Sequence, residues 1–240
     1  MTRRALFWCG YVKPAPGRLE APGTSSDAIT LANDLEFAVK AARALGVQDK
    51  DMYAFVCSPE LVPAGYGGQR FVPTLSALGR ILTGLARTST GNDATLVFAT
   101  NHGVPEGLLT SALVDEFEPD APSFLTPARL AELLDTLLGV QVLILAACYA
   151  GSFLPVAQTD RRLVLAACGD EVYVAGGSVA WAGFPAELFR AWCGISPDEE
   201  ACPPRMDVDA AFTFAEQAVM SGDAGRRIQP RRAGNIQWPR

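Results

Sequence analysis

The sequence has only one histidine, His102, among its 240 residues. Any chemistry that needs an imidazole must therefore use this side chain. A structural zinc site is unsupported, because such sites combine several cysteine and histidine ligands at short spacings and the sequence has no closely paired cysteines. We expect no bound metal, and His102 becomes the first candidate functional residue.

Long apolar runs are also absent. No stretch approaches the roughly 18 apolar residues that a membrane span requires. The start of the sequence is basic, but its apolar run is short and no small-residue cleavage site follows, so we interpret it as a first strand. A net charge of -6 argues against general attraction to nucleic acids or to anionic lipids. Neither a membrane nor a nucleic acid is expected as a partner.

The Cys-x-x-Cys motif is missing, which disfavours a thiol-disulfide exchange protein. The 6 cysteines are scattered through a chain too long for a miniprotein held by disulfides. Reduced thiols in apolar strands fit a cytoplasmic location best, although Cys193 and Cys202 could form a pair. Basic residues gather in the segment from about 222 to 240, where a solvated tail is favoured over an anion-binding or partner-binding site.

Hydrophobic residues make up 49% of the chain, which is enough for a substantial core. Strand-like apolar runs alternate with helical patterns, and this alternation predicts one α/β domain over 1–240 with a mainly parallel sheet between two layers of helices. The expected strands cover 5–11, 52–57, 94–100, 140–147 and 162–167. The expected helices cover 27–45, 74–86, 126–138, 184–192 and 207–220. Inserted loops are expected over 12–26, 58–73 and 194–205, and a small hairpin over 108–114.

Two of these strands end in residues that carry chemistry. His102 follows the strand over 94–100, and Cys148 follows the strand over 140–147. The carboxyl ends of parallel strands open at one edge of a sheet, where ligands bind, and neighbouring strands lie about 5 Å apart. We therefore expect a thiol and an imidazole to converge, which is the pairing of a nucleophile with a proton-transfer partner.

Small residues come shortly after both His102 and Cys148 in the sequence. Gly103 has no side chain, so its amide could approach a substrate oxygen closely, although a simple tight turn is equally compatible. Cys148 precedes Tyr149-Ala-Gly-Ser152, where a thiol can be exposed. Cys168 also ends a strand and is the second candidate nucleophile, but the acidic residues beside it would disfavour a thiolate.

Other enzyme classes fit less well. A serine hydrolase could use Ser178 in a Gly-Gly-Ser sequence, but the hydrolase order places a histidine after the serine and none follows. The phosphate-binding Gly-x-x-x-x-Gly-Lys loop and a proper dinucleotide glycine pattern are both missing. No nucleotide cofactor is therefore expected.

The segments Asn101-His102-Gly103 and Ala147-Cys148-Tyr-Ala-Gly-Ser152 resemble the dyad segments of the caspase and legumain clan of cysteine proteases. The stretch 32–47 is similar to the first helix of caspase-like and metacaspase-like domains. The order and spacing of these motifs agree with the clan, and the resemblance extends over roughly residues 5 to 190.

The resemblance implies a caspase-like α/β/α sandwich that acts as a cysteine endopeptidase without metal or cofactor. By this analogy Cys148 attacks the scissile carbonyl, and His102 donates a proton to the leaving amine. The backbone amides of Gly103 and Cys148 would hold the oxyanion. The expected partners are a protein or peptide substrate and a regulatory protein that restrains the enzyme.

The sequence departs from the clan two positions before the nucleophile. Caspases have a glutamine there and legumain-like enzymes an acidic residue, whereas this chain has Ala146. A preference for aspartate or asparagine before the cleaved bond therefore cannot be transferred to this chain. Asp170, Glu171 and Tyr173 are candidate substrate-binding residues that would favour a basic residue before the cut, although a solvated loop is at least as compatible. The alternative function is a caspase-like scaffold without protease activity that acts as a binding or regulatory module.

Overall fold

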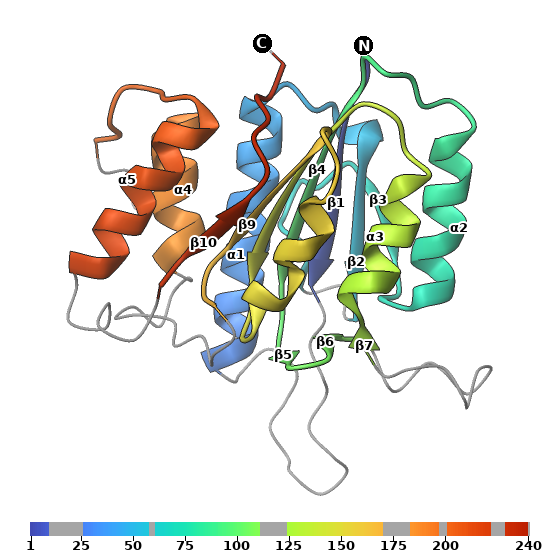
Figure 1. Cartoon of the computed structure of the whole chain (residues 1–240), viewed down its shortest axis with the longest axis horizontal. Helices are drawn as coiled ribbons and strands as arrows, with labels where there is room; N and C mark the ends of the chain where they lie inside the picture. The colour runs from blue at the N-terminus through green and yellow to red at the C-terminus, as the bar shows by residue number, and fades with distance from the viewer. Residues whose placement is uncertain are drawn as a thin grey trace, which may run out of the picture.

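A seven-stranded sheet forms the centre of the protein, with its strands in the order β10-β9-β8-β4-β1-β2-β3 (Figure 1). The computed structural model describes residues 1–9, 26–57, 61–110, 124–169, 183–196, 201–221 and 229–239. All neighbouring strands of this sheet are parallel except β10, which runs antiparallel to β9. The strands are β1 (Arg3–Cys9), β2 (Met52–Val56), β3 (Gln69–Phe71), β4 (Ala94–Thr100), β8 (Val140–Ala146), β9 (Arg162–Ala166) and β10 (Arg231–Ala233).

Helices cover both faces of the sheet and complete three layers. One face packs against α1 (Ser26–Ala44) and α4 (Gly183–Cys193), with α5 (Val208–Ser221) beside α4. The other face packs against α2 (Leu75–Ala86), α3 (Pro127–Asp135) and the 3-10 helix η4 (Ala150–Ala157). Because both faces are covered, the central strands are apolar on both sides, as parallel sheets require. The predicted α/β/α sandwich with a mainly parallel sheet is confirmed.

A second, smaller sheet follows β4. It is antiparallel and consists of β5 (Gly103–Val104), β6 (Gly107–Leu109) and β7 (Phe124–Leu125). The hairpin predicted over 108–114 is therefore displaced: β6 pairs with β5 before it and with β7 after it. Residues 111–123 lie outside the described part of the chain. The small sheet begins directly after His102 and thus borders the carboxyl edge of the main sheet.

The helix starts follow local capping signals. The hydroxyl of Thr74 accepts a hydrogen bond from the Ala77 amide, and the hydroxyl of Thr126 accepts one from the Arg129 amide, both over 3.1 Å. Threonine is a favourable N-cap, and the proline that follows Thr126 suits the first turn of a helix. The third helix ends at Asp135, earlier than the predicted 138, and Gly139, with a left-handed φ of 85°, then turns the chain into β8.

Two short edge strands were not predicted from the sequence. The strand β3 lies inside the segment 58–73, which was expected to be a loop, and β10 lies inside the basic segment 222–240, which was expected to be a solvated tail. In the described part of that segment, Trp238 is buried and packs edge-on against Trp192 with ring centroids 6.0 Å apart. Arg231 and Arg232 are exposed, as expected for a solvated segment, whereas Ile236 and Trp238 are buried, so the solvated-tail interpretation does not hold for these two residues. The predicted loops over 12–26 and 194–205 lie partly outside the described residues.

Candidate active site

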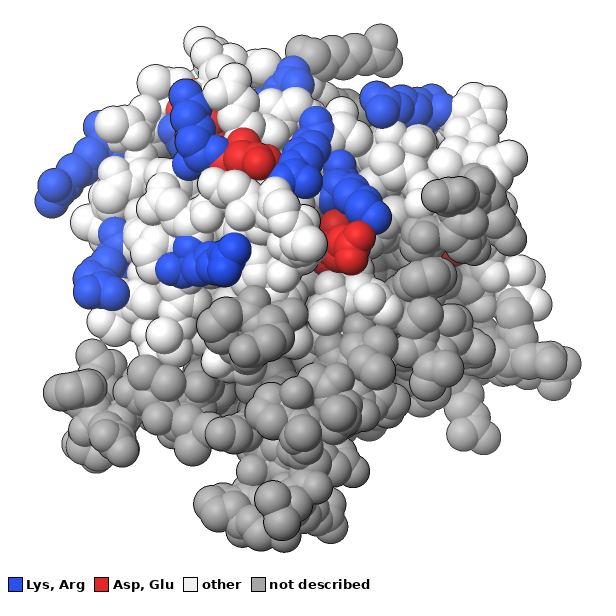
Figure 2. All heavy atoms as spheres, turned by 180° about the vertical axis from the view of Figure 1, so that it is seen from behind, with Lys and Arg blue, Asp and Glu red and all other residues white. Residues whose placement is uncertain are grey.

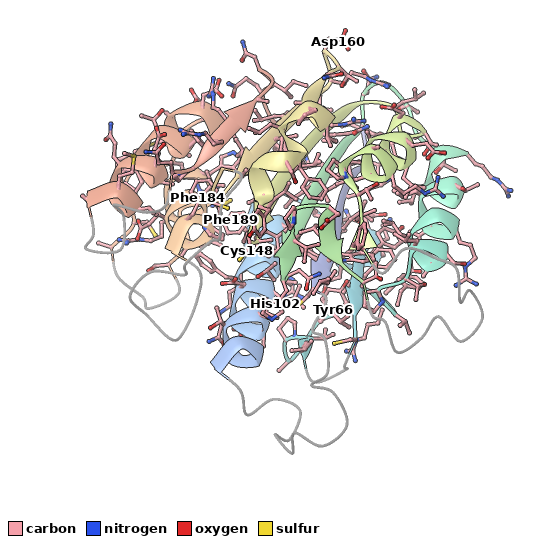
Figure 3. All side chains as sticks on the ribbon, turned by 60° about the horizontal axis from the view of Figure 1, so that its bottom comes forward. Tyr66, His102, Cys148, Asp160, Phe184 and Phe189 are labelled. Carbon is pink, nitrogen blue, oxygen red and sulfur yellow. The ribbon has the colours of Figure 1, made fainter. Side chains whose placement is uncertain are left out.

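The strands β4 and β8 are direct neighbours, and their parallel register pairs Thr100 with Ala146. His102 comes two residues after Thr100, and Cys148 comes two residues after Ala146. Both residues therefore leave the sheet at the same edge. Figure 3 shows the labelled His102 and Cys148 on the same side of the molecule, whereas Asp160 lies on the opposite side.

The backbone contact between Gly103 and Cys148 is unusually close. A Cβ atom built on Gly103 would overlap the carbonyl oxygen of Cys148 and would lie 3.4 Å from the Cβ of Ala147. No residue other than glycine fits without a backbone shift. The segment that carries the imidazole is thus packed directly against the segment that carries the thiol.

Exposure distinguishes Cys148 from the buried cysteines. The side chain of His102 is exposed and Cys148 is half-buried, as are Cys57 and Cys202. The other three cysteines, Cys9, Cys168 and Cys193, are buried, and none of the six forms a disulfide. Burial raises the pKa of Cys9 well above its ordinary value and the pKa of Cys193 to about 12. Buried neutral thiols are poor nucleophiles, so three cysteines are disfavoured as reactive groups.

Asn101 holds the backbone of His102 in place. Its side-chain oxygen accepts a hydrogen bond from the His102 amide over 2.7 Å, and its side-chain nitrogen donates one to the Leu109 carbonyl. The Leu109 amide in turn donates to the His102 carbonyl over 3.1 Å. Trp8 Nε1 donates to the same Leu109 carbonyl over 3.3 Å. Asn101 was not predicted as a site residue; its position directly before the histidine is the only signal in the sequence.

Tyr149 turns the chain sharply just after Cys148. It has φ 56° and ψ 22°, and among the described residues no other non-glycine residue has a positive φ. Such a left-handed residue costs of order 1–2 kcal/mol and persists only where the surrounding structure holds it. The Tyr149 carbonyl accepts hydrogen bonds from the amide and the hydroxyl of Ser152, over 3.1 and 2.8 Å. This turn places Cys148 between a buried strand and the start of η4.

The residues that follow β9 support this turn from the other side. The Gly151 amide donates a hydrogen bond to the Gly169 carbonyl over 3.0 Å. A Cβ atom on Gly151 would lie 2.5 Å from the Gly169 carbonyl carbon, so the two backbones require glycine here. Cys168 is buried, and its thiol donates to the Ala147 carbonyl over 3.2 Å. Burial therefore makes this second candidate nucleophile inaccessible to a substrate.

The candidate substrate-binding residues Asp170, Glu171 and Tyr173 lie outside the described residues. Their role stays a prediction. Ala146 is the last residue of β8 and is buried. Its methyl group offers no charge or hydrogen bond with which to recognise a substrate side chain.

A large cavity in the described part of the chain lies away from His102 and Cys148. A cavity of about 760 Å³ lies at the amino edge of the sheet, where Arg3, Trp192, Arg205 and Trp238 contribute to its lining. Neither His102 nor Cys148 lines it. The pairing of a thiol with an imidazole, and not the volume of a hollow, therefore selects the carboxyl edge as the candidate active site.

Metal-binding clusters and membrane-spanning helices are both missing from the described residues. Within the described residues, no group of three or more histidine, cysteine, aspartate or glutamate side chains is placed to hold a metal ion. No helix in the described segments combines the length and apolar character needed to cross a bilayer. On the face drawn in Figure 2, basic side chains are separated by acidic and uncharged ones and do not form one continuous strip.

Comparison with known proteins supports the fold. No family model and no curated protein sequence matches this chain. Among solved structures, it is similar to caspase-1 from Spodoptera frugiperda, with a TM-score of 0.61 and 12% sequence identity. The match covers 97% of this chain and 86% of the caspase chain. The fold is caspase-like. At this identity the likeness establishes the arrangement of the elements, and the chemistry must be argued from the residues.

Proposed function

We propose that the protein is a cysteine endopeptidase in which Cys148 is the nucleophile and His102 is the general acid and base. The thiol of Cys148 would transfer its proton to His102, and its sulfur would attack the carbonyl carbon of a peptide bond and form a tetrahedral intermediate. As the carbon-nitrogen bond breaks, His102 would donate a proton to the leaving amine. Water would then hydrolyse the thioester, with His102 accepting its proton, and would release the acid and the free thiol.

The observation that carries this proposal is the packing of Gly103 against the Cys148 carbonyl. It brings the exposed imidazole and the half-buried thiol to one edge of the sheet, from two adjacent parallel strands. The same packing supports the amides of Gly103 and Cys148 as oxyanion donors, since both belong to the backbone at this contact. Loss of one such donor typically costs 10²–10³-fold in rate.

The substrate of the proposed enzyme is a protein or peptide. Acidic groups at Asp170 and Glu171, with Tyr173 nearby, would favour a basic residue before the cleaved bond. A reducing cytoplasm suits a chain whose 6 cysteines are all free of disulfides. A regulatory partner protein would restrain the enzyme, because an unrestrained intracellular protease would damage its host.

Cleavage of a peptide library provides the direct test. The parent protein should cleave a subset of peptides, and C148A and H102A should each lower kcat/KM by about 10³-fold or more, because each removes a reacting group. C202A is the matched control, since it removes another half-buried cysteine, and it should retain the parental rate. Parental turnover by C148A or by H102A would overturn the assignment of the two residues.

Thiol labelling separates an enzyme from an inert scaffold. Iodoacetamide should modify Cys148 faster than the other cysteines, as followed by mass spectrometry of peptides from the native protein. Cys9, Cys168 and Cys193 should react only after unfolding, because they are buried. Uniformly slow labelling together with no turnover would favour the alternative function, a caspase-like binding or regulatory module.

A further inference from the structure

We propose that Cys168 positions the peptide unit whose amide binds the oxyanion. This inference rests on the proposed function, because it gives Cys168 a role in the same reaction. Cys168 does not touch the reacting atoms. It is a positioning residue that acts through the peptide bond between Ala147 and Cys148.

The peptide bond between Ala147 and Cys148 is planar. The carbonyl of Ala147 and the amide of Cys148 belong to one rigid plane, so fixing the direction of the carbonyl also fixes the direction of the N–H group. The Cys168 thiol donates a hydrogen bond to this carbonyl over 3.2 Å. The contact therefore determines where the proposed oxyanion donor points.

The sulfur is itself held in place by the fold. Cys168 is 0% exposed, and Ala147 beside it is also buried, in the core cluster that η4 covers. The parallel register between β8 and β9 brings the two residues together, because it pairs Leu145 with Ala166 and the Ala167 amide donates to the Leu145 carbonyl over 2.9 Å. A thiol in such a site has few rotamers, so it constrains the carbonyl more firmly than a mobile surface group would.

The hydrogen bond from Cys168 to Ala147 lies between two backbone links that join the segments of β8 and β9. The ladder between β8 and β9 ends just before Ala147, and the next backbone link between the two segments joins Gly151 to Gly169 over 3.0 Å. Between these links the chain contains Cys148 and the left-handed Tyr149. The Ala147–Cys148 peptide thus lies between two backbone links, close to a sharp turn of the chain. The thiol of Cys168 supplies a hydrogen bond within this interval and opposes rotation of this peptide.

Four variants test the inference. C168A removes the donor, C168V removes the donor without leaving a cavity, and C168S keeps a donor. C193A is the matched control, because it removes a buried cysteine from the other core cluster. The steady-state kinetics of each are measured with the most rapidly cleaved library peptide. Inhibition is measured with the aldehyde of that peptide, which forms an oxyanion on reaction with Cys148, and alkylation of Cys148 is measured with iodoacetamide, which forms none.

We expect C168A and C168V to lower kcat about three- to tenfold, the usual effect of one hydrogen bond, with KM changed less than twofold. The affinity for the aldehyde should fall by a similar factor, and the alkylation rate of Cys148 should stay at the parental value. C168S should recover part of the loss, and C193A should show none. This pattern is expected only if the oxyanion donor has been misdirected.

Other outcomes overturn the inference. If C168S is as impaired as C168A and C168V, the hydrogen bond is not what matters. If alkylation and turnover fall together, or if C193A loses as much, Cys168 has a general structural role. Failure of the proposed function is distinguished beforehand, because the parent protein would then show no hydrolysis that depends on Cys148.

Discussion

The two edges of the central sheet are built from different kinds of interaction. At the amino edge, charged side chains are buried and held by partners. Arg4 and Asp93 form an ion pair over 3.0 Å, with both side chains buried. Asp93 also accepts hydrogen bonds from the amides of Thr2 and Thr90, over 2.7 and 3.0 Å. These bonds join the starts of β1 and β4 and the turn between α2 and β4.

A second buried charge lies at the same edge. All three guanidinium nitrogens of Arg162 donate hydrogen bonds, to Gln141, to the Val156 carbonyl and to Asp135, over 2.8 to 2.9 Å. Burial lowers the pKa of Arg162, and the neighbouring Asp135 carboxylate partly offsets this effect. The buried charge thus connects β9, β8, α3 and η4 where the strands begin.

The carboxyl edge relies mainly on close backbone packing and neutral hydrogen bonds; its buried carboxylate, Asp34, accepts a hydrogen bond from the uncharged Thr100 hydroxyl over 2.8 Å. Gly103 touches the Cys148 carbonyl, Gly151 touches Gly169, and Asn101 holds His102. Here the side chains of His102 and Cys148 remain at least partly exposed. The comparison suggests that the amino edge supplies stability while the carboxyl edge supplies geometry. Substitutions at the two edges should therefore differ in which property they change.

The largest effect is expected at the amino edge, from D93A. This substitution leaves Arg4 buried without its charged partner, which typically costs about 3–5 kcal/mol of the free energy of unfolding. Chemical denaturation measures this loss, and kcat/KM per folded molecule should stay unchanged. E36A is the control, because Glu36 belongs to the exposed pair with Lys40 and should cost less than about 1 kcal/mol. A large loss of activity in folded D93A would show that the amino edge also affects the geometry of the site.

Acid should weaken the same edge. Burial raises the pKa of Asp93, but the amides of Thr2 and Thr90 and the Arg4 guanidinium together hold it below its ordinary value. A lowered pKa in the folded state stabilises the protein above the pKa of the unfolded state, about 3.9, and this stabilisation is lost as pH falls through the folded value. The unfolding free energy of the parent should thus decrease below about pH 4. In D93N this part of the acid dependence should be missing.

The second largest effect is expected at the carboxyl edge, from G103A. The added Cβ would overlap the Cys148 carbonyl oxygen, so the backbone at one of the two residues must move. A displacement of this kind should lower kcat/KM by about 10²-fold. G84A is the matched control: nothing lies within 4 Å of its added Cβ in the helix α2, so it should retain activity and gain up to about 1 kcal/mol of stability. Parental activity in G103A would show that this contact does not shape the site.

The central strands were predictable because burial on both faces produces long apolar runs. The strand β4 was predicted with its observed bounds, and β8 and β9 within one residue at their ends. The edge strands β3 and β10 were missed, since each has three residues with mostly exposed, polar side chains such as Gln69 and Arg231. Their strand conformation depends on pairing with a neighbour, which no local pattern encodes.

The candidate site also contains residues that could be predicted from the sequence and residues that could not. His102 and Cys148 could be placed together from the sequence because the ends of parallel strands share one edge of a sheet. The supporting contacts could not be predicted: the thiol of Cys168 reaches Ala147 only through the register between β8 and β9, and Asn101 reaches Leu109 only through the small sheet. Sequence patterns thus indicated the proposed reacting groups, whereas the residues that would position them depend on tertiary packing.

The smallest effect is expected from N101A, which tests whether a supporting residue of the carboxyl edge affects geometry and not stability. The His102 amide would lose its acceptor and the Leu109 carbonyl one of its donors. The imidazole would then be held less firmly, and we expect kcat to fall about tenfold with KM changed less than twofold. N101D should recover part of the loss, because a carboxylate still accepts from the His102 amide.

T126A, which removes the N-cap of α3, serves as a control that should cost about 1 kcal/mol of stability without changing kcat. If N101A and T126A both lowered the stability and neither lowered kcat, Asn101 would be a stabilising residue. The two edges would then not differ in the property that their residues control.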